Sequence, residues 1–158
     1  MEAREIMTRD VVTFGPEMSI PEAQDALLHY RIHGAPVVGG AGQLVGMVSF
    51  TDLSARPGRS VRDVMTPDPI TVGEDTPVED VAALMLDQMV RRVPVVEGGR
   101  VVGVISASDI IQVFLNLHEW APQRPGAVAA PAAQRAGDLL HRMPRPAVAG
   151  RRRREGRR

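Results

Sequence analysis

Short apolar runs broken by glycine recur along the first 110 residues of the chain. In each half, two runs rich in β-branched residues flank a glycine-rich segment, which is typical of a β-hairpin. We therefore predict two hairpins. Their paired strands are Ala35–Val38 with Leu44–Ser49 and Val93–Val96 with Val101–Ser106, and their turns lie at Gly39–Gly42 and Gly98–Gly99.

Ahead of each hairpin, apolar residues recur at spacings of three and four, the pattern of an amphipathic helix. Thr76, Pro77 and Glu79 predict the start of the helix in the second half, as N-cap, first helical residue and acidic partner of a capping box. Ser19 and Glu22 predict the same cap in the first half. We expect the apolar face to pack on a sheet; in the second half it comprises Val78, Val81, Ala82, Met85, Met89 and Val90.

The two halves are copies of one unit. Residues 4–54 align with residues 62–111 with one deletion, at an offset of 58 before the glycine turn and 57 after it. Each copy is predicted to begin with a short helix and a strand and to end with a helix, giving the order β-α-β-β-α after the first helix. The short helix and the strand are Ala3–Met7 and Val11–Phe14 in the first copy, and Val61–Met65 and Ile70–Val72 in the second. The last helix of the second copy runs from Ser108 to about His118, and Pro57 and Gly58 cut short its counterpart in the first copy.

The predicted fold class is α/β of the α+β kind. A unit of about 50 residues is too small to bury a good core, so we expect the two copies to pack sheet to sheet with pseudo-two-fold symmetry. The predicted domains are repeat 1 (residues 1–58), repeat 2 (residues 59–118) and a tail (residues 119–158).

The zero net charge of the 158 residues conceals an acidic body and a basic tail. Residues 1–118 hold nine arginines against 16 acidic residues, a net charge of −7, and the tail carries +7. The tail is rich in Ala, Pro and Arg and has little apolar periodicity, so we expect it to be mostly disordered.

Composition excludes several classes. The chain has no cysteine, which rules out disulfides, thiolate zinc sites and a cysteine nucleophile. No apolar run is long enough to span a bilayer, and the charged N-terminus does not look like a secretory signal, so we expect a cytoplasmic protein. No nucleophile with a partnered base is indicated, and we expect no enzyme activity. His29 and His33 lack an acidic ligand at a matching spacing, so no metal site is expected.

Several motifs recur in register in both copies: Met-Thr, Pro-Val-Val and a closing Gly-x-x-Ser-x-x-Asp. The closing motif spans Gly46–Asp52 and Gly103–Asp109. This pattern resembles the CBS domain, and two tandem copies over about residues 4–117 resemble a CBS pair, or Bateman module. The resemblance implies a regulatory, non-catalytic module that binds AMP, ADP, ATP or S-adenosylmethionine in clefts between the repeats. No cofactor would then be obligatory.

The closing motifs supply the expected ribose sites, Ser106 with Asp109 and Ser49 with Asp52. A carboxylate can accept hydrogen bonds from both ribose hydroxyls, and a serine hydroxyl can add a third bond. The alternative is structural. Thr51 or Ser108 would cap the following helix, and the aspartate would only favour the positive end of that helix.

Phosphate is expected to meet Arg91 and Arg92 in repeat 2, where many members of the family carry a basic residue. The alternative is a solvated helix end, where arginine is favourable anyway. His33 and Gly34 stand at the matching positions of repeat 1, which should therefore bind phosphate less well. By family position the adenine walls would be Val12, Ile70, Val37, Val95, Pro36, Pro94, Thr66 and Thr8, all of them plausible structural residues in any case.

Three expectations concern partners. A ligand sensor would signal to an effector protein that the sequence does not identify. The chain would instead be an assembly module if it forms a homodimer without any nucleotide, through apolar residues of the last helix, Ile110, Val113, Phe114 and Leu117. Arg151–Arg154 would support only unspecific, salt-sensitive contact with nucleic acid, so we do not expect nucleic acid to be a specific partner.

Overall fold

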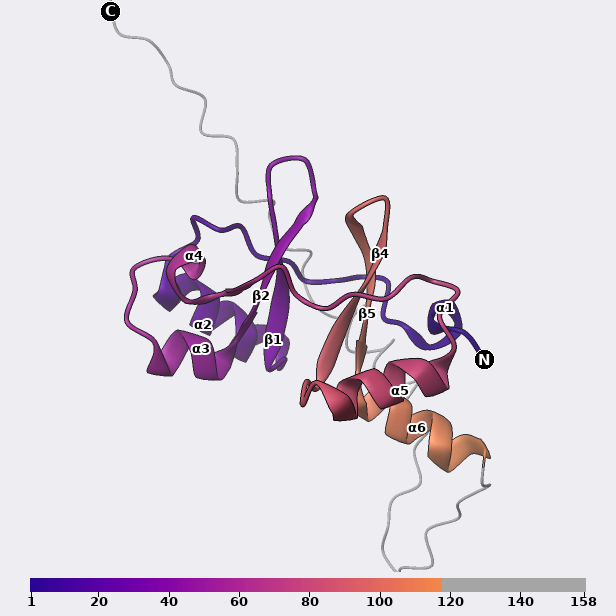
Figure 1. Cartoon of the computed structure of the whole chain (residues 1–158). Helices are drawn as coiled ribbons and strands as arrows, with labels where there is room; N and C mark the ends of the chain where they lie inside the picture. The colour runs from indigo at the N-terminus through magenta and orange to yellow at the C-terminus, as the bar shows by residue number, and fades with distance from the viewer. Residues whose placement is uncertain (118–158) are drawn as a thin grey trace, which may run out of the picture. The chain divides into compact units, whose positions relative to one another are not determined.

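This computed structural model describes residues 1–117 of the chain. Two β-hairpins lie side by side at the centre of this part (Figure 1). One pairs β1 (Gly34–Val38) with β2 (Leu44–Ser49), and the other pairs β4 (Arg92–Glu97) with β5 (Arg100–Ser106). Gly98 and Gly99 adopt φ values of 55° and 80°, which only glycine takes readily, so the tight second turn needs them. Both predicted hairpins are confirmed.

Helices cover the outer side of each hairpin, so the sheets lie inside and the helices outside (Figure 1). Across the junction, the Leu44 N–H donates to the Gly99 carbonyl at 3.0 Å. This arrangement confirms the predicted α+β fold with two repeats packed sheet to sheet. Helices α2 (Ile20–Tyr30), α3 (Phe50–Ala55) and α4 (Val61–Val64) lie beside the first hairpin, and α1 (Ala3–Ile6), α5 (Val78–Asp87) and α6 (Ala107–Leu117) lie beside the second.

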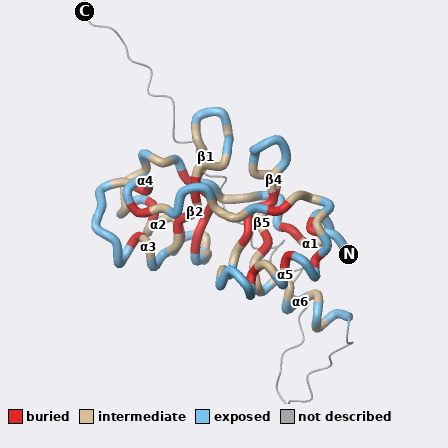
Figure 2. Tube along the Cα trace, in the orientation of Figure 1, coloured by how far each residue is buried: buried red, intermediate tan, exposed pale blue. Residues whose placement is uncertain are grey.

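The two repeats exchange their first helices. Val61 and Val64 of α4 are fully buried in the core beneath the first hairpin, whereas Ala3 and Met7, in and after α1, belong to the core beneath the second. Figure 2 shows these buried stretches in red on both sides of the junction. Each core is therefore built from both copies of the sequence unit, which ties the two repeats together. The boundaries at residues 58, 59 and 118 stay a prediction.

The exchange also changes the strands. The two-residue strand β3 (Thr66–Pro67), from the start of repeat 2, pairs with β2 of repeat 1. In the same way Thr8, from repeat 1, forms a bridge with Val104 of β5 in repeat 2, with N–H to carbonyl distances of 2.9 and 3.0 Å. The two Met-Thr motifs therefore lie on the partner repeat.

The predicted strands over Val11–Phe14 and Ile70–Val72 are wrong, because each shrinks to a single parallel bridge. The Phe14 N–H donates to the Pro36 carbonyl, and the Val38 N–H donates to the Phe14 carbonyl. The next bond in such a ladder would need an N–H on Pro36, which proline lacks. Pro94 limits Val72 in repeat 2 in the same way.

The predicted N-terminal cap is confirmed for α2 but not for α5. Ser19 caps α2, and Glu22 returns the bond to the Ser19 backbone, as predicted. The predicted capping box of α5 is wrong: the Thr76 hydroxyl accepts instead from the Gly73 N–H at 3.1 Å, and the N-cap is Pro77. The threonine side chain closes the preceding turn, so it is not available to the helix.

Within residues 1–117, no helix is long and apolar enough to cross a membrane. The tail predicted to be disordered lies outside the described residues.

Candidate functional site

The second strand of each hairpin ends at a serine that begins the next helix. Ser106 donates to Oδ2 of Asp109 from both its hydroxyl and its backbone N–H, at 2.6 and 2.7 Å. Ser49 makes the same two bonds to Oδ2 of Asp52, at 2.8 and 2.9 Å. Each aspartate N–H donates back to the serine hydroxyl oxygen. The structure thus brings together both pairs of residues that the sequence proposes for ribose.

These pairs are capping boxes. A residue of each closing motif therefore caps the following helix, as the structural alternative expected, but the capping residue is a different one. Ser49 caps α3, not Thr51, and the same bonds place the cap of α6 at Ser106, not at Ser108. Capping occupies one carboxylate oxygen. An ionised carboxylate has about four acceptor positions on two oxygens, and the cap leaves Oδ1 of each aspartate unused. The cap and a ligand contact are therefore compatible.

The two aspartates differ in whether a cation on the same helix lies close to Oδ1, the oxygen that the cap does not use. Oδ1 of Asp52 lies 3.4 Å from Nε of Arg56, one helical turn along α3. Arg56 is held there by a second bond, from Nη1 to the Val64 carbonyl at 3.0 Å. Val113 stands at the position of Arg56 in repeat 2, so α6 offers Asp109 no equivalent cation. This difference was not part of the sequence analysis, although the alignment of the repeats contains it.

Arg92 is the cation of the second site. It is the first residue of β4 and is half-buried, and its Nη1 donates to the Gly34 carbonyl of repeat 1 at 3.2 Å. Burial lowers the pKa of the Arg92 guanidinium, and the nearby Asp109 carboxylate acts in the opposite direction by stabilising the charged form. Arg92 therefore stands where the two repeats meet, within electrostatic range of the Asp109 carboxylate.

The other predicted phosphate residues lie nearer the solvent. Arg91 is exposed, and its backbone carbonyl accepts from the Ala107 N–H at 2.9 Å. His33 is also exposed and makes the matching backbone bond with Phe50. Their roles stay predictions, and the structure distinguishes Arg92 from both by its burial.

The predicted adenine walls divide into two groups. Thr8 and Thr66 are exposed, and Val12 and Ile70 are half-buried, so a ligand can reach them. The others are fully buried core residues, and their side chains would have to move to touch adenine; they are Val37, Val95, Pro36 and Pro94. Because the repeats exchange their first segments, Thr8 lies beside β5 and Thr66 beside β2.

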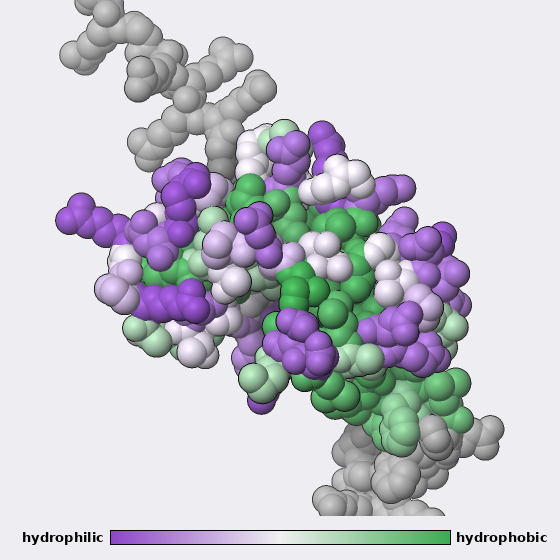
Figure 3. Space-filling model, in the orientation of Figure 1, coloured by the Kyte–Doolittle hydropathy of each residue, from purple (hydrophilic) through white to green (hydrophobic). Residues whose placement is uncertain are grey.

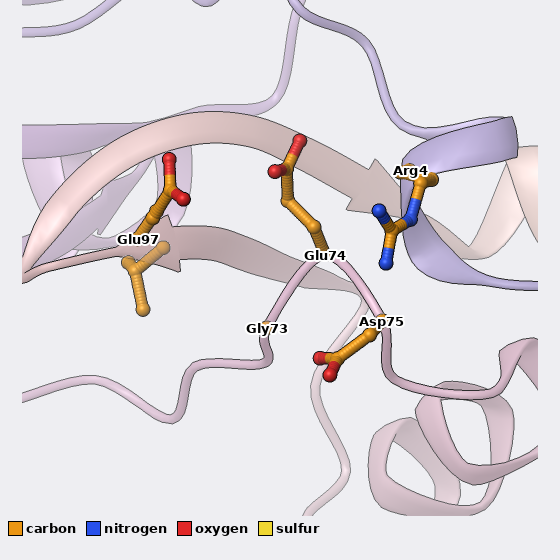
Figure 4. A pocket seen from close by; sticks show the side chains of 6 residues that line it. Arg4, Gly73, Glu74, Asp75 and Glu97 are labelled. Atoms are coloured by element: carbon orange, nitrogen blue, oxygen red, sulfur yellow. The ribbon is translucent and has the colours of Figure 1, made fainter.

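An open pocket that the sequence did not predict lies at the other end of the second hairpin. Its volume is about 270 Å³, and three of its six lining residues are acidic (Figure 4). Carboxylates repel phosphate, so this pocket does not suit a nucleotide. Among residues 1–117, no group of three or more histidine, aspartate or glutamate side chains is placed to hold a metal ion. The lining residues are Arg4, Gly73, Glu74, Asp75, Val96 and Glu97.

Two pseudosymmetric α+β repeats, joined sheet to sheet and each carrying a Ser-x-x-Asp cap, define a tandem-repeat module with a candidate site at the start of each final helix. The CBS domain family model matches residues 3–57 and 61–116. The chain belongs to the CBS domain family, as a pair of CBS domains.

Solved CBS pairs share this fold. The CBS domain pair of protein MJ0100, in complex with 5′-methylthioadenosine and S-adenosyl-L-methionine, is 31% identical with a TM-score of 0.71, over 74% of this chain and 98% of that one. CBSX2 of Arabidopsis thaliana, in complex with AMP, is 30% identical with a TM-score of 0.69, over 74% and 98%. Both neighbours carry adenosine ligands.

Curated relatives are longer proteins. Inosine-5′-monophosphate dehydrogenase of Korarchaeum cryptofilum is 34% identical over 136 residues, which are 82% of this chain but 28% of that enzyme. The chain spans about a quarter to a third of the length of the first relatives it matches.

Proposed function

We propose that this protein is a regulatory module that binds an adenosine-containing ligand and passes the signal to a partner protein. The constellation of Ser106, Asp109 and Arg92 carries the proposal. The serine and Oδ1 of the aspartate offer acceptors for a ribose, and the half-buried guanidinium offers a bidentate donor for a phosphate. The adenosine ligands of the two solved neighbours support the same class of ligand.

The module is regulatory rather than catalytic under this proposal. Ser106 and Ser49 each donate both the hydroxyl and the backbone N–H to one oxygen of an aspartate and so cap a helix, and we assign them to capping and ligand contact rather than to catalysis. Signalling requires the ligand to bind two states of the protein with different affinity. The effector protein and the cytoplasmic location stay predictions from the sequence.

Thermal unfolding of the full chain tests the proposal. AMP, ADP, ATP and S-adenosylmethionine are added separately at millimolar concentration. A ligand present at 100 times its Kd adds about 2.7 kcal/mol to the free energy of unfolding, which raises Tm measurably. We expect at least one of the four to do so.

A matched pair of variants gives the test its specificity. Asp109→Asn keeps an acceptor for the cap but removes the charge, and we expect it to abolish the shift. Asp87→Asn makes the same change at the end of α5, and the variant should keep the ligand-induced rise in Tm. No shift with any of the four ligands, in a folded protein, would refute ligand sensing.

A second candidate function, homodimer assembly without a ligand, is favoured by the exposed apolar surface of repeat 2. Ile110 and Val113 do not belong to this surface as predicted, because Ile110 packs against the core and Val113 is half-buried. The exposed large side chains of α6 are Ile111, Phe114 and Leu117.

The surface extends beyond α6. Leu86 and Met89, in and just after the neighbouring helix α5, are 81% and 88% exposed. Figure 3 shows hydrophobic surface over the α6 end of the described chain. So many exposed apolar groups on adjacent helices are typical of an interface.

Solution mass decides between assembly and monomer. We expect sedimentation to give a dimer for the wild-type chain and a monomer for the double variant Ile111→Lys, Leu117→Lys, because two charges would be buried in the interface. Leu28→Lys, on α2 of repeat 1 and 65% exposed, is the matched control. A monomeric wild-type protein would refute assembly.

A further inference from the structure

The pseudo-two-fold symmetry of the two sites fails at one pair of positions. Arg92 begins β4, and the residue that begins β1 at the matching position is Gly34. A side chain at position 34 would not fit, because a Cβ there would lie 2.8 Å from the Val48 carbonyl oxygen. The first site therefore has no cation of its own at the place where the second site has Arg92.

Arg92 also reaches the first site. Its Nη1 donates to the Gly34 carbonyl across the repeat junction. A Cβ on Gly34 would lie 3.4 Å from that Nη1 and 3.3 Å from the Cα of Ser49, so the guanidinium and the first capping serine flank the same point. One half-buried cation thus stands between the two Ser-x-x-Asp motifs.

The two aspartates also differ in whether a cation of their own helix lies beside them, and here the first site is the one that has it. Asp52 already has a cation on its second oxygen, Arg56, which is fixed by its bond to Val64. Asp109 has no such neighbour on its own helix, because Val113 takes the place of Arg56. In the first site the carboxylate is already paired with Arg56 and β1 supplies no cation at the position of Arg92. In the second site Asp109 has no cation on its own helix, and Arg92 lies nearby.

We propose that each chain binds a single anionic adenosine ligand, at the Ser106–Asp109 site, and that Arg92 is both its phosphate contact and the residue that links this site to repeat 1. The inference rests on the proposed function and deepens it by assigning the ligand to one site. The Ser49–Asp52 site then accepts only an adenosine whose 5′ group carries no negative charge.

The same bond supplies the means of signalling. Phosphate oxygens are charged acceptors and bind a guanidinium more strongly than a neutral carbonyl does. A phosphate that binds Nη1 of Arg92 at the second site therefore competes with the Gly34 carbonyl for that donor. Loss of that bond loosens repeat 1 at the start of β1, and by linkage any partner that senses repeat 1 senses the ligand.

Calorimetric titration of the full chain with AMP and, separately, with adenosine tests the assignment. We expect one AMP per chain, and Arg92→Ala should weaken AMP binding about tenfold or more while adenosine binding changes little. Arg92→Lys keeps the charge and should recover part of the loss. Arg100→Ala, an exposed arginine at the far end of the same hairpin, is the control and should bind AMP as the wild type does.

The outcomes separate the two proposals. Two AMP molecules bound per chain with equal affinity, or an Arg92→Ala protein that keeps wild-type AMP affinity, would overturn the inference and leave adenosine sensing intact. Failure of AMP to bind the wild type would overturn the inference, and the proposed function would fall with it only if adenosine, ADP, ATP and S-adenosylmethionine also failed to bind. If Arg92→Ala unfolds, the Arg92→Lys protein and the wild-type stoichiometry still decide the matter.

Discussion

The exchange of first helices between the repeats depends on two glycines, and replacing either tests it. A methionine side chain packs against each of these glycines, and it comes from the residue that follows an exchanged helix. Met65 packs on Gly46 in β2, and Met7 packs on Gly103 in β5. Neither glycine has a positive φ, so alanine is compatible with the backbone at both positions. The cost of Gly→Ala is then a matter of space alone.

The two positions differ in how their neighbours can respond. A Cβ at Gly46 would lie 2.6 Å from the Met65 sulfur and 2.9 Å from the backbone oxygen of Thr66, which β3 pairing holds in place. The nearest atoms to a Cβ at Gly103 all belong to the Met7 side chain, with its Cγ at 2.8 Å and its Cβ at 3.1 Å. The fixed backbone oxygen should make Gly46→Ala the more costly change.

The magnitudes follow from two opposing terms. Overpacking in a dense interior costs about 1–3 kcal/mol, and Gly→Ala returns about 0.4–1 kcal/mol by restricting the unfolded chain. We expect a net loss of about 2 kcal/mol for Gly46→Ala and about 1 kcal/mol or less for Gly103→Ala. At about 4 °C per kcal/mol, Tm should fall by about 8 °C and by about 4 °C or less.

Urea and thermal unfolding measure these differences. Gly15→Ala is the matched control, because a Cβ there would meet nothing within 4 Å. Met7→Ala gives a further check: it opens a cavity and is costly alone, but adding Gly103→Ala to it should cost nothing more, since the methyl group enters space that Met7 has left.

The reasoning fails if Gly46→Ala unfolds at the same temperature as Gly15→Ala. It fails also if Gly103→Ala costs as much in the Met7→Ala background as in the wild type, because the methionine would then not be the group that the new methyl meets.

Three further results are expected. Ser49→Ala removes the cap of α3 and should lower the free energy of unfolding by about 1 kcal/mol, and an unchanged urea midpoint would contradict the capping role. Bonds from the Ser19 hydroxyl and backbone lower the pKa of Glu22 below 4.5, so its stabilising contribution is full above pH 4.5 and is lost as pH falls through the lower folded-state pKa. Glu22→Gln should therefore lower Tm at about pH 7 but not at about pH 3, and an equal effect at both would oppose the assignment. Arg62→Ala breaks an exposed pair with Glu17 at 2.7 Å and should cost less than about 1 kcal/mol in urea unfolding, so a larger loss would show a further role for Arg62.

Sequence reasoning succeeded where the deciding physics is local. Glycine turns between β-branched runs predicted both hairpins, and the Ser19 and Glu22 pattern predicted a cap, because these signals act within a few residues. It failed at Thr76, whose hydroxyl bonds to the preceding turn, and at Val11–Phe14, where the ladder stops at Pro36 on another strand. Both errors involve a partner that the local pattern does not specify.

The candidate site shows the same division. The repeat alignment by itself predicted which residues form the two Ser-x-x-Asp pairs, since a serine and an aspartate three residues apart at a helix start always lie within reach. That Arg92 reaches the Gly34 carbonyl, 58 residues away in sequence, is visible only in the folded chain.

The sequence alone determined the repeat, the two hairpins and the two Ser-x-x-Asp pairs, because all three depend on residue types at short spacings. The tertiary structure alone decided that the repeats exchange their first helices, that Pro36 and Pro94 lie buried in the core, and that one arginine stands between two sites. Such features depend on how two similar surfaces pack against each other. Two copies of one pattern can be joined in more than one way, and packing selects among them.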